Sequence, residues 1–273
     1  CDRALPSTHP ARPLALTLAG AGRLLGGRHE EAISLLRRGH TLAVAADVGT
    51  TAVEALSVLS VALGAQGDTS AAWEAAATAE RIWQAQDLHD SASSTGLLRS
   101  ATAPLRAVRG DSEGARRDLE QLAATQAAGE ASPLPWLSVI ARVGAAEALL
   151  ALADRSAASV ALARARVLLA MVPPSPFLAL LVARADRALV DAGPLASLSP
   201  AEQAVWSYVG TRLTVKEIAE QMYLSADTVK THLSSIYRKL GLASRREAQQ
   251  LYDDLAAGGR PTTSRGGAQA DVS

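Results

Sequence analysis

Apolar residues return at helical spacing along most of the chain, in two segments of different composition. In residues 13–191, Ala-, Leu- and Arg-rich stretches carry an apolar side chain every three or four positions, which is typical of helices with one buried face. Residues 196–257 show the same spacing in shorter stretches, each opened by a Ser or Thr. The pattern predicts an all-α fold, with paired helices followed by a compact four-helix segment.

A repeat in the first segment is marked by its turns. Each turn separates two helical stretches, and the turns recur at spacings of 40, 43 and 43 residues. Five residues after each turn comes an alanine and nine after it a second apolar residue, so that both lie on one helix face. The turns are at Gly27, Gly67, Gly110 and Ala153, the alanines are Ala32, Ala72, Ala115 and Ala158, and the second positions are Leu36, Ala76, Leu119 and Leu162.

Helical hairpins of this kind resemble tetratricopeptide repeats, although the period is longer than the usual value of about 34 residues. The Asp or Ser/Thr after each turn can cap the second helix of its hairpin. Pro133, Pro135 and the prolines of 173–176 interrupt helices and predict linkers between hairpins. The expected organisation is a lead-in at 1–12, a helical-repeat solenoid at 13–194, a four-helix domain at 195–257 and a Gly/Ser/Thr-rich, disordered tail at 258–273.

Capping signals divide the second segment into four helices. Ser199 with Glu202 and Thr214 with Glu217 have the spacing of capping boxes, and Ser225 can cap a longer third helix that ends at Gly241. Ser244 with Glu247 repeats the signal at a fourth helix. The helices expected from these signals cover 201–209, 215–222, 226–240 and 245–255.

The third of these helices has two distinct faces. An apolar stripe at i, i+4, i+7 and i+11 would pin one face to the rest of the domain, leaving Lys, Thr and Ser side chains on the other. A helix held in this way suits the major groove of DNA. The stripe is Val229, Leu233, Ile236 and Leu240, and the opposite face is Ala226, Lys230, Thr231, Ser234 and Arg238.

Charge supports a local DNA-binding surface on a balanced protein. The 273 residues contain 27 basic and 27 acidic side chains, which argues against indiscriminate coating of nucleic acid. Residues 228–248 nevertheless hold five basic residues and one acid. The three lysines, Lys216, Lys230 and Lys239, all lie in the second segment.

Residues 198–248 resemble the LuxR-type helix-turn-helix domain of bacterial transcription factors. The resemblance implies that the third helix reads DNA, that Lys230, Thr231 and Ser234 face the bases, and that the fourth helix forms a dimer contact. The expected phosphate contacts are Thr214, Lys216, Ser225, Thr228, Arg238, Lys239 and Arg245. The matching residues are Leu198, Glu202, Val205, Ile218, Ala219, Ser225, Thr228, Val229, Lys230, His232, Ile236, Lys239, Leu240, Arg245, Glu247 and Ala248.

Three positions depart from the family pattern: Arg212 replaces a turn glycine, Ala201 an arginine and Met222 a common leucine. The helical-repeat region resembles the C-terminal half of MalT-like regulators, which carry an ATPase module further upstream. Residues 22–28 lack the Lys-Ser/Thr of a phosphate-binding loop. The sequence starts at Cys1 without a signal-peptide pattern, which favours a piece of a longer cytoplasmic chain.

Little in the sequence suggests catalysis or a bound cofactor. The single cysteine excludes a disulfide framework and a Cys-based zinc site, and the five histidines have no metal-ligand spacing. No apolar run reaches the roughly 18 residues that span a bilayer. Trp73, Trp83 and Trp136 are expected as core anchors, and Arg pairs such as 37–38 and 116–117 as solvated helix faces.

The sequence thus favours a cytoplasmic, non-enzymatic transcription regulator that binds duplex DNA as a homodimer, without cofactor or membrane. Its repeats would act as a sensor, oligomerisation or partner-binding module for a protein or small-molecule effector, and RNA polymerase is a further candidate partner. Two alternatives stay open: a helical-repeat interaction scaffold, and the C-terminal part of a larger ATP-dependent MalT-like regulator.

Overall fold

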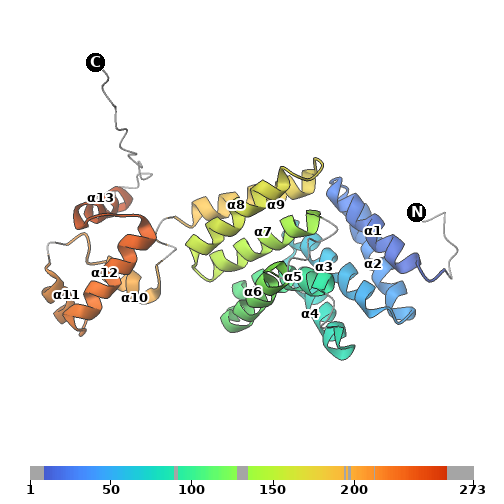
Figure 1. Ribbon diagram of the computed structural model, residues 1–273, viewed down its shortest axis with the longest axis horizontal. Coiled ribbons are helices and arrows are strands. Elements are labelled where there is room, and N and C mark those ends of the chain that lie inside the picture. Colours follow the sequence, from blue (N-terminus) through green and yellow to red (C-terminus); the bar gives the residue numbers. More distant parts are fainter. Residues whose placement is uncertain are drawn as a thin grey trace, which may run out of the picture. The chain divides into compact units, whose positions relative to one another are not determined.

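The computed structural model describes residues 9–88, 92–127, 135–193, 195, 198–211 and 213–256 (Figure 1). Across these ranges the chain forms thirteen α-helices and no β-strand, which confirms the predicted all-α fold. Contacts divide the chain into two units, Cys1–Gly193 and Pro194–Ser273. The tail expected at 258–273 and residues 1–8 of the expected lead-in lie outside the described residues. Within the described part, no helix is long and apolar enough to cross a membrane.

The first unit is a row of four helical hairpins followed by a single helix. Within each hairpin the two helices pack against each other, and the first helices of successive hairpins form an inner layer that α9 continues (Figure 1). The hairpins are α1 (Arg12–Leu25) with α2 (His29–Ala45), α3 (Gly49–Ala65) with α4 (Thr69–Ala85), α5 (Ala92–Val108) with α6 (Ser112–Ala127), and α7 (Pro135–Ala151) with α8 (Arg155–Leu169); α9 is Pro176–Asp191.

The four predicted turns all have left-handed backbone conformations. Gly27, Gly67 and Gly110 have φ values of 78°, 88° and 84°, and Ala153 adopts a φ of 61° in spite of its Cβ atom. A non-glycine residue in this region costs roughly 1–2 kcal/mol, so the turn geometry is imposed by the packing of the hairpin. The predicted caps are confirmed where the following residue is an aspartate: the side chains of Asp68, Asp111 and Asp154 accept hydrogen bonds from backbone N–H groups three residues later. Arg28, at the first turn, makes no side-chain cap.

Small residues allow the paired helices to approach closely. The four predicted alanines (Ala32, Ala72, Ala115 and Ala158) are completely buried. A Cβ atom added at Gly20 of α1 would lie 2.8 Å from Cγ of Leu36, which shows how near α2 comes. Of the four second positions, Leu36, Ala76 and Leu162 are fully buried and Leu119 is half-buried. The predicted repeat register is therefore confirmed at these positions, with Leu119 of α6 less buried than its counterparts.

The row of hairpins curves until its last helix meets its first (Figure 1). The hydroxyl of Ser175, which caps α9, donates a 2.7 Å hydrogen bond to the carbonyl of Leu25 in α1. The rings of His29 and Phe177 pack edge to face with centroids 5.7 Å apart. Of the prolines expected in linkers, Pro173 and Pro174 lie between α8 and α9 as predicted, Pro135 and Pro176 instead open α7 and α9, and Pro133 lies outside the described residues.

A buried cluster of charged side chains joins α4, α5 and α6. Nη1 of Arg99 lies 2.8 Å from Oε1 of Glu80 and 3.2 Å from Oδ1 of Asp118, and Arg106 pairs with the same two carboxylates. Asp118 also accepts a 2.6 Å hydrogen bond from Thr102. Burial raises the pKa of Asp118 above its ordinary value, against the opposing effects of the Thr102 hydrogen bond and the two arginines. The sequence pattern did not predict this cluster.

The predicted tryptophan anchors are confirmed in part. Trp83 is buried, and Cζ of Arg99 lies 4.5 Å from its ring centroid. Trp73 and Trp136 are only half-buried. The arginine pairs 37–38 and 116–117 are exposed, as expected, and Arg117 pairs with Glu113 one turn earlier.

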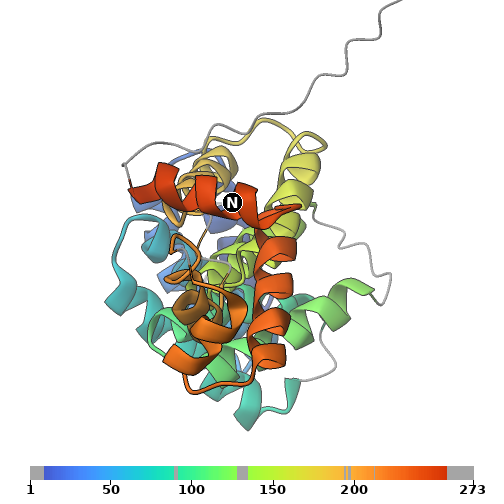
Figure 2. The same ribbon diagram turned by 90° about the vertical axis from the view of Figure 1, so that its left-hand side faces the viewer.

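The second unit is a small four-helix domain. The long α12 (Ala226–Leu240) packs against the short α10 (Pro200–Trp206) and α11 (Val215–Gln221), and α13 (Arg245–Ala256) crosses its C-terminal end (Figures 1 and 2). The four expected helices are present, and α10 ends three residues earlier than the predicted 201–209. Their shared core includes Leu198, Val205, Trp206, Ile218, Val229, Leu233, Ile236 and Ala248.

The buried charge cluster yields a stability prediction. Asp118→Ala should lower the free energy of unfolding by about 2–3 kcal/mol, because Arg99 would lose one of its two buried carboxylates. Urea unfolding followed by far-ultraviolet circular dichroism measures the change. Glu113→Ala, which removes an exposed pair on the same helix, should leave the transition in place. Equal stability of the Asp118 variant and the wild type would show that the cluster does not stabilise the unit.

Candidate nucleic-acid interface

The two helices expected to contact DNA are joined by a tight turn and capped at both starts. Thr214 and Glu217 form the predicted capping box of α11, and the hydroxyl of Ser225 accepts a 3.1 Å hydrogen bond from the Thr228 N–H at the start of α12. Between the helices, Tyr223 adopts a φ of 55°. Gly241 ends α12 in the left-handed conformation, as predicted. Local sequence signals thus define both ends of the helix-turn-helix.

The two faces of α12 are separated as predicted, except that Ala226, expected on the polar face, is half-buried and packs against the core. Val229, Leu233 and Ile236 are buried against the other helices, and Leu240 is half-buried. The base-contact candidates Lys230, Thr231 and Ser234 are exposed, as is Arg238. A helix anchored by one face can therefore present the other to a ligand without exposing the domain core.

Asp227, which was not among the predicted site residues, restrains the exposed face of α12. Nζ of Lys230 lies 3.0 Å from Oδ1 of Asp227, and the Thr231 hydroxyl donates a 2.9 Å hydrogen bond to the Asp227 carbonyl. Both members of the ion pair are largely exposed, so DNA can displace the carboxylate from Lys230 at little cost. The signal that could have revealed it is the i, i+3 spacing of an acid in the first helical turn and a lysine.

The candidates for phosphate contacts fall into three groups. Lys216 and Arg238 are exposed cations. Thr214, Ser225 and Thr228 lie at helix starts, where the hydroxyls of Thr214 and Ser225 serve as caps. Lys239 and Arg245 are instead engaged within the domain: Lys239 pairs with Glu202, and Arg245 donates to the carbonyl of Leu213. Arg212, which departs from the family pattern, lies outside the described residues.

Lys239 therefore has a structural partner in place of the expected free position. Its Nζ lies 2.6 Å from Oε2 of Glu202, which is almost completely buried and also closes the capping box of α10 with Ser199. Burial raises the pKa of Glu202, but hydrogen bonds from Lys239, Ser235 and Ser199 outweigh it and lower this pKa to about 2. The pair ties α12 to α10, and the phosphate contact expected of Lys239 stays a prediction.

In the ranges that the structure describes, no group of three or more His, Cys, Asp or Glu side chains could hold a metal ion. The chemistry available to the exposed face of α12 is hydrogen bonding and charge pairing from Lys230, Thr231, Ser234 and Arg238.

The geometry is that of a helix-turn-helix domain, and comparison with known proteins assigns its family. Residues 196–252 match the family model described as bacterial regulatory proteins, luxR family. This segment of the chain is a LuxR-family domain, as the sequence resemblance predicted. The match does not extend to the helical repeats, so their resemblance to MalT-like regulators stays a prediction.

Curated relatives match the same part of the chain. A putative HTH-type transcriptional regulator of Mycobacterium bovis is 46% identical over 66 residues, which are 24% of this chain and 7% of that protein. The probable HTH-type transcriptional regulator GfsR of Streptomyces halstedii is 43% identical over 58 residues, 21% and 24% of the two chains. A nitrate/nitrite response regulator protein homolog of Haemophilus influenzae is 41% identical over 59 residues, 22% and 28%.

The chain thus covers less than a third of the length of each of these three relatives. No solved structure matches it significantly.

The tie between Glu202 and Lys239 yields a second prediction. Lys239→Met keeps the aliphatic stem but leaves a buried carboxylate without its cation, so the domain should be destabilised by about 2 kcal/mol at pH 7. The folded-state pKa of Glu202 lies below its ordinary value of 4.5, so its contribution is complete above pH 4.5 and is lost as the pH falls toward 2. The difference between variant and wild type should therefore shrink at pH 3.

Hydrogen exchange of peptides from residues 198–256 of the full chain, followed by mass spectrometry, measures this change in the second unit alone. Lys216→Met removes an exposed ammonium and should leave exchange unchanged. Equal protection in the Lys239 variant and the wild type at pH 7 would refute the structural role of Lys239.

Proposed function

We propose that the chain is a bacterial transcription regulator that binds specific duplex DNA by inserting α12 into the major groove. The observation that carries this proposal is the division of α12, whose apolar side chains Val229, Leu233 and Ile236 are buried while its polar face is exposed within a LuxR-family domain. The names of the matched relatives, which describe transcriptional or response regulators, support it.

In this proposal, base reading and backbone binding are performed by different residues. Lys230, Thr231 and Ser234 reach base edges, where lysine can donate to guanine and the hydroxyls can both donate and accept. Lys216 and Arg238 bind phosphates by charge, which adds affinity for any sequence. Further contacts with the DNA backbone come from side chains that already make hydrogen bonds within the domain: Thr214, Ser225, Thr228, Lys239 and Arg245.

The other parts of the proposal concern assembly and control. A homodimer joined through α13 would place two copies of α12 on a two-fold DNA site. The helical repeats would serve as a sensor, oligomerisation or partner-binding module, and RNA polymerase would be a partner if the protein activates transcription. Such a regulator acts in the bacterial cytoplasm, where the DNA is.

The rival function is a protein-interaction scaffold in which the last domain has lost DNA binding. The basic side chains on the exposed face of α12 and at Lys216 speak against it. Selection from a random-sequence DNA pool separates the two, because a scaffold would enrich no sequence. Reading the gene upstream of Cys1 tests whether the chain is the C-terminal part of a larger ATP-dependent regulator.

Charge reversal on α12 tests the assignment of the recognition helix. Lys230→Glu should abolish binding to the selected site, because the new carboxylate joins Asp227 at the DNA surface, while the helical circular dichroism signal stays unchanged. Fluorescence anisotropy with labelled DNA measures the affinity. Arg37→Glu makes the same change in net charge on an exposed position of α2 and should bind normally. Normal binding by the Lys230 variant would refute the assignment.

Truncation of a phosphate contact should have a different signature. Arg238→Ala is expected to weaken binding to specific and unrelated DNA by similar factors and to lower the slope of log affinity against log salt by about one. Titrations at several salt concentrations measure both effects. A loss confined to the specific site would instead place Arg238 among the base-reading residues.

A further inference from the structure

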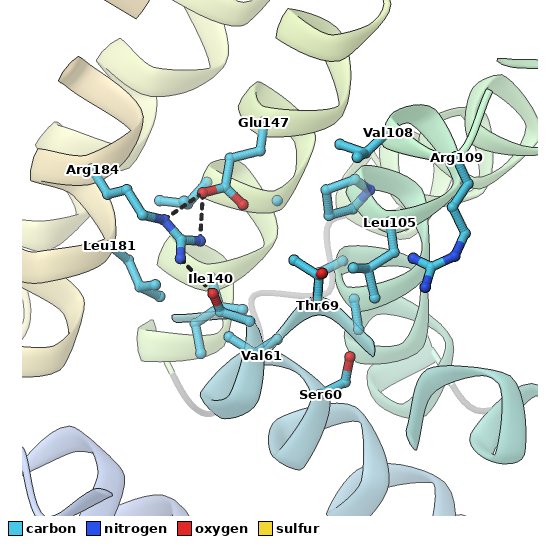
Figure 3. A pocket seen from close by; sticks show the side chains of 16 residues that line it. Ser60, Val61, Thr69, Leu105, Val108, Arg109, Ile140, Glu147, Leu181 and Arg184 are labelled. Atoms are coloured by element: carbon cyan, nitrogen blue, oxygen red, sulfur yellow. Dashed lines mark hydrogen bonds and ion pairs between the residues drawn. The ribbon is translucent and has the colours of Figure 1, made fainter. Parts of the chain in front are cut away.

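The inner helices of the first unit enclose a cavity that the proposed DNA-binding function does not use. Its volume is about 520 Å³, and its walls come from α3, α5, α7 and α9, with Thr69 at the start of α4 and Arg109 just after α5 (Figure 3). Most of the wall is apolar, with side chains that include Val61, Leu105, Ile140, Val143 and Leu181. Binding sites for small organic molecules typically have volumes of about 300–1,000 Å³ and apolar walls with a few polar groups, which is the character of this cavity.

A close contact between two helices shapes one wall. A Cβ atom added at Gly144 of α7 would lie 2.4 Å from the carbonyl oxygen of Ser100 in α5, so only glycine permits this approach. Pro104 lies inside α5 and has no N–H group, so the Ser100 carbonyl cannot accept the usual helical hydrogen bond from it. The two helices therefore approach closely at Gly144 and Ser100, and the cavity lies next to this contact.

An ion pair supplies the main polar group of the cavity. Nε and Nη2 of Arg184 lie 3.1 Å and 2.7 Å from the same oxygen, Oε1 of Glu147. Nη1 of Arg184 donates a 2.8 Å hydrogen bond to the carbonyl of Gly64. Figure 3 shows the second carboxylate oxygen of Glu147 turned away from Arg184, toward the α5 side of the cavity. This oxygen can accept a hydrogen bond from a bound molecule.

We propose that this cavity is a binding site for an uncharged, mainly apolar small molecule that carries one hydrogen-bond donor for Glu147. The apolar walls favour burial of hydrocarbon or aromatic surface. Arg184 is already neutralised by Glu147 and has donors committed to two partners, so it disfavours an anionic ligand at this position. The second arginine of the lining, Arg109, is stacked over the ring of Trp73, with its Cζ 4.6 Å from the ring centroid. A helix about 10–12 Å across is too wide for a cavity of this size, which argues for a small molecule over a partner helix.

The site gives the helical repeats a ligand of defined chemistry. α3, α5 and α7 belong to three different hairpins and α9 is the single helix that follows them, so a molecule held among the four helices would bias how they pack. That the bound molecule is the effector of a regulator rests on the proposed function; that the cavity binds it does not.

The test uses N-phenyl-1-naphthylamine, a neutral aromatic amine with a single N–H donor whose fluorescence rises in apolar surroundings. The full chain should bind it saturably at one molecule per chain. Val61→Trp, which fills the cavity from α3, should weaken binding at least about tenfold through loss of the apolar volume. Val167→Trp places the same side chain on an exposed position of α8 and should bind as the wild type does.

Two further measurements keep the test decisive. If Val61→Trp loses its helical signal, Leu105→Trp fills the cavity from α5 instead. 1-Phenoxynaphthalene has an ether oxygen in place of the N–H and is used as a competitor of the dye. Its inhibition constant should be about three- to tenfold higher than the dissociation constant of the dye, in line with the loss of one hydrogen bond. An inhibition constant of the ether equal to the dissociation constant of the dye would refute the need for a hydrogen-bond donor at Glu147.

Unsaturable binding, or equal binding by the wild type and both cavity-filled variants, would overturn the site. Lys230→Glu should bind the dye normally, since that residue belongs to the other unit. Dye binding can therefore fail while DNA binding holds, or hold while DNA binding fails, so the two proposals are tested separately.

Discussion

The geometry of the C-terminal unit depends on the buried carboxylate of Glu202. It accepts a hydrogen bond from the Ser199 N–H at the start of α10 and binds the ammonium of Lys239, 37 residues later in α12. Separation of a buried carboxylate from its cation costs a large free energy, so this ion pair holds α10 and α12 in a fixed relative position. The ion pair and the buried apolar stripe hold one face of α12 against the domain, so its polar face points to solvent. Recognition of DNA by such a helix depends on its rigid position as much as on the groups it presents.

In the first unit, small side chains and tight turns allow the paired helices to pack closely. Fully buried alanines let the helices of each hairpin approach, and the left-handed turns reverse the chain between them. Repetition of this unit curves the row until Ser175 reaches Leu25, and a cavity lies beside the hydrophobic core that the inner helices share. The charged cluster around Arg99 and Asp118 joins α4, α5 and α6 at the middle of the row. We infer that the repeats form a frame whose interior is available to a ligand.

Features encoded by local spacing could be predicted from the sequence, whereas features that depend on distant residues could not. The four turns, the buried alanines, both capping boxes and the two faces of α12 follow from residues within one or two helical turns of each other. The ion pair of Lys239 with Glu202 was not predicted, because the two residues lie on different helices. The cluster of Glu80, Arg99, Arg106 and Asp118 spans three helices, and the meeting of α9 with α1 joins residues 150 positions apart. Amphipathic spacing shows which face of a helix is buried, but it does not show which other helices pack against that face.

Site-specific crosslinking tests the central claim, that the exposed face of α12 enters the groove of DNA, most directly. Cys1 is the single cysteine of the chain, so Cys1→Ser with Ser234→Cys leaves one thiol on this face for a photoactivatable crosslinker. Bound to DNA selected from a random pool, the labelled protein should crosslink to bases at a fixed position in each half-site, while a label at Ser112→Cys on α6 should not show that pattern. A complex that forms on the selected DNA without crosslinks to bases from position 234 would contradict the claim.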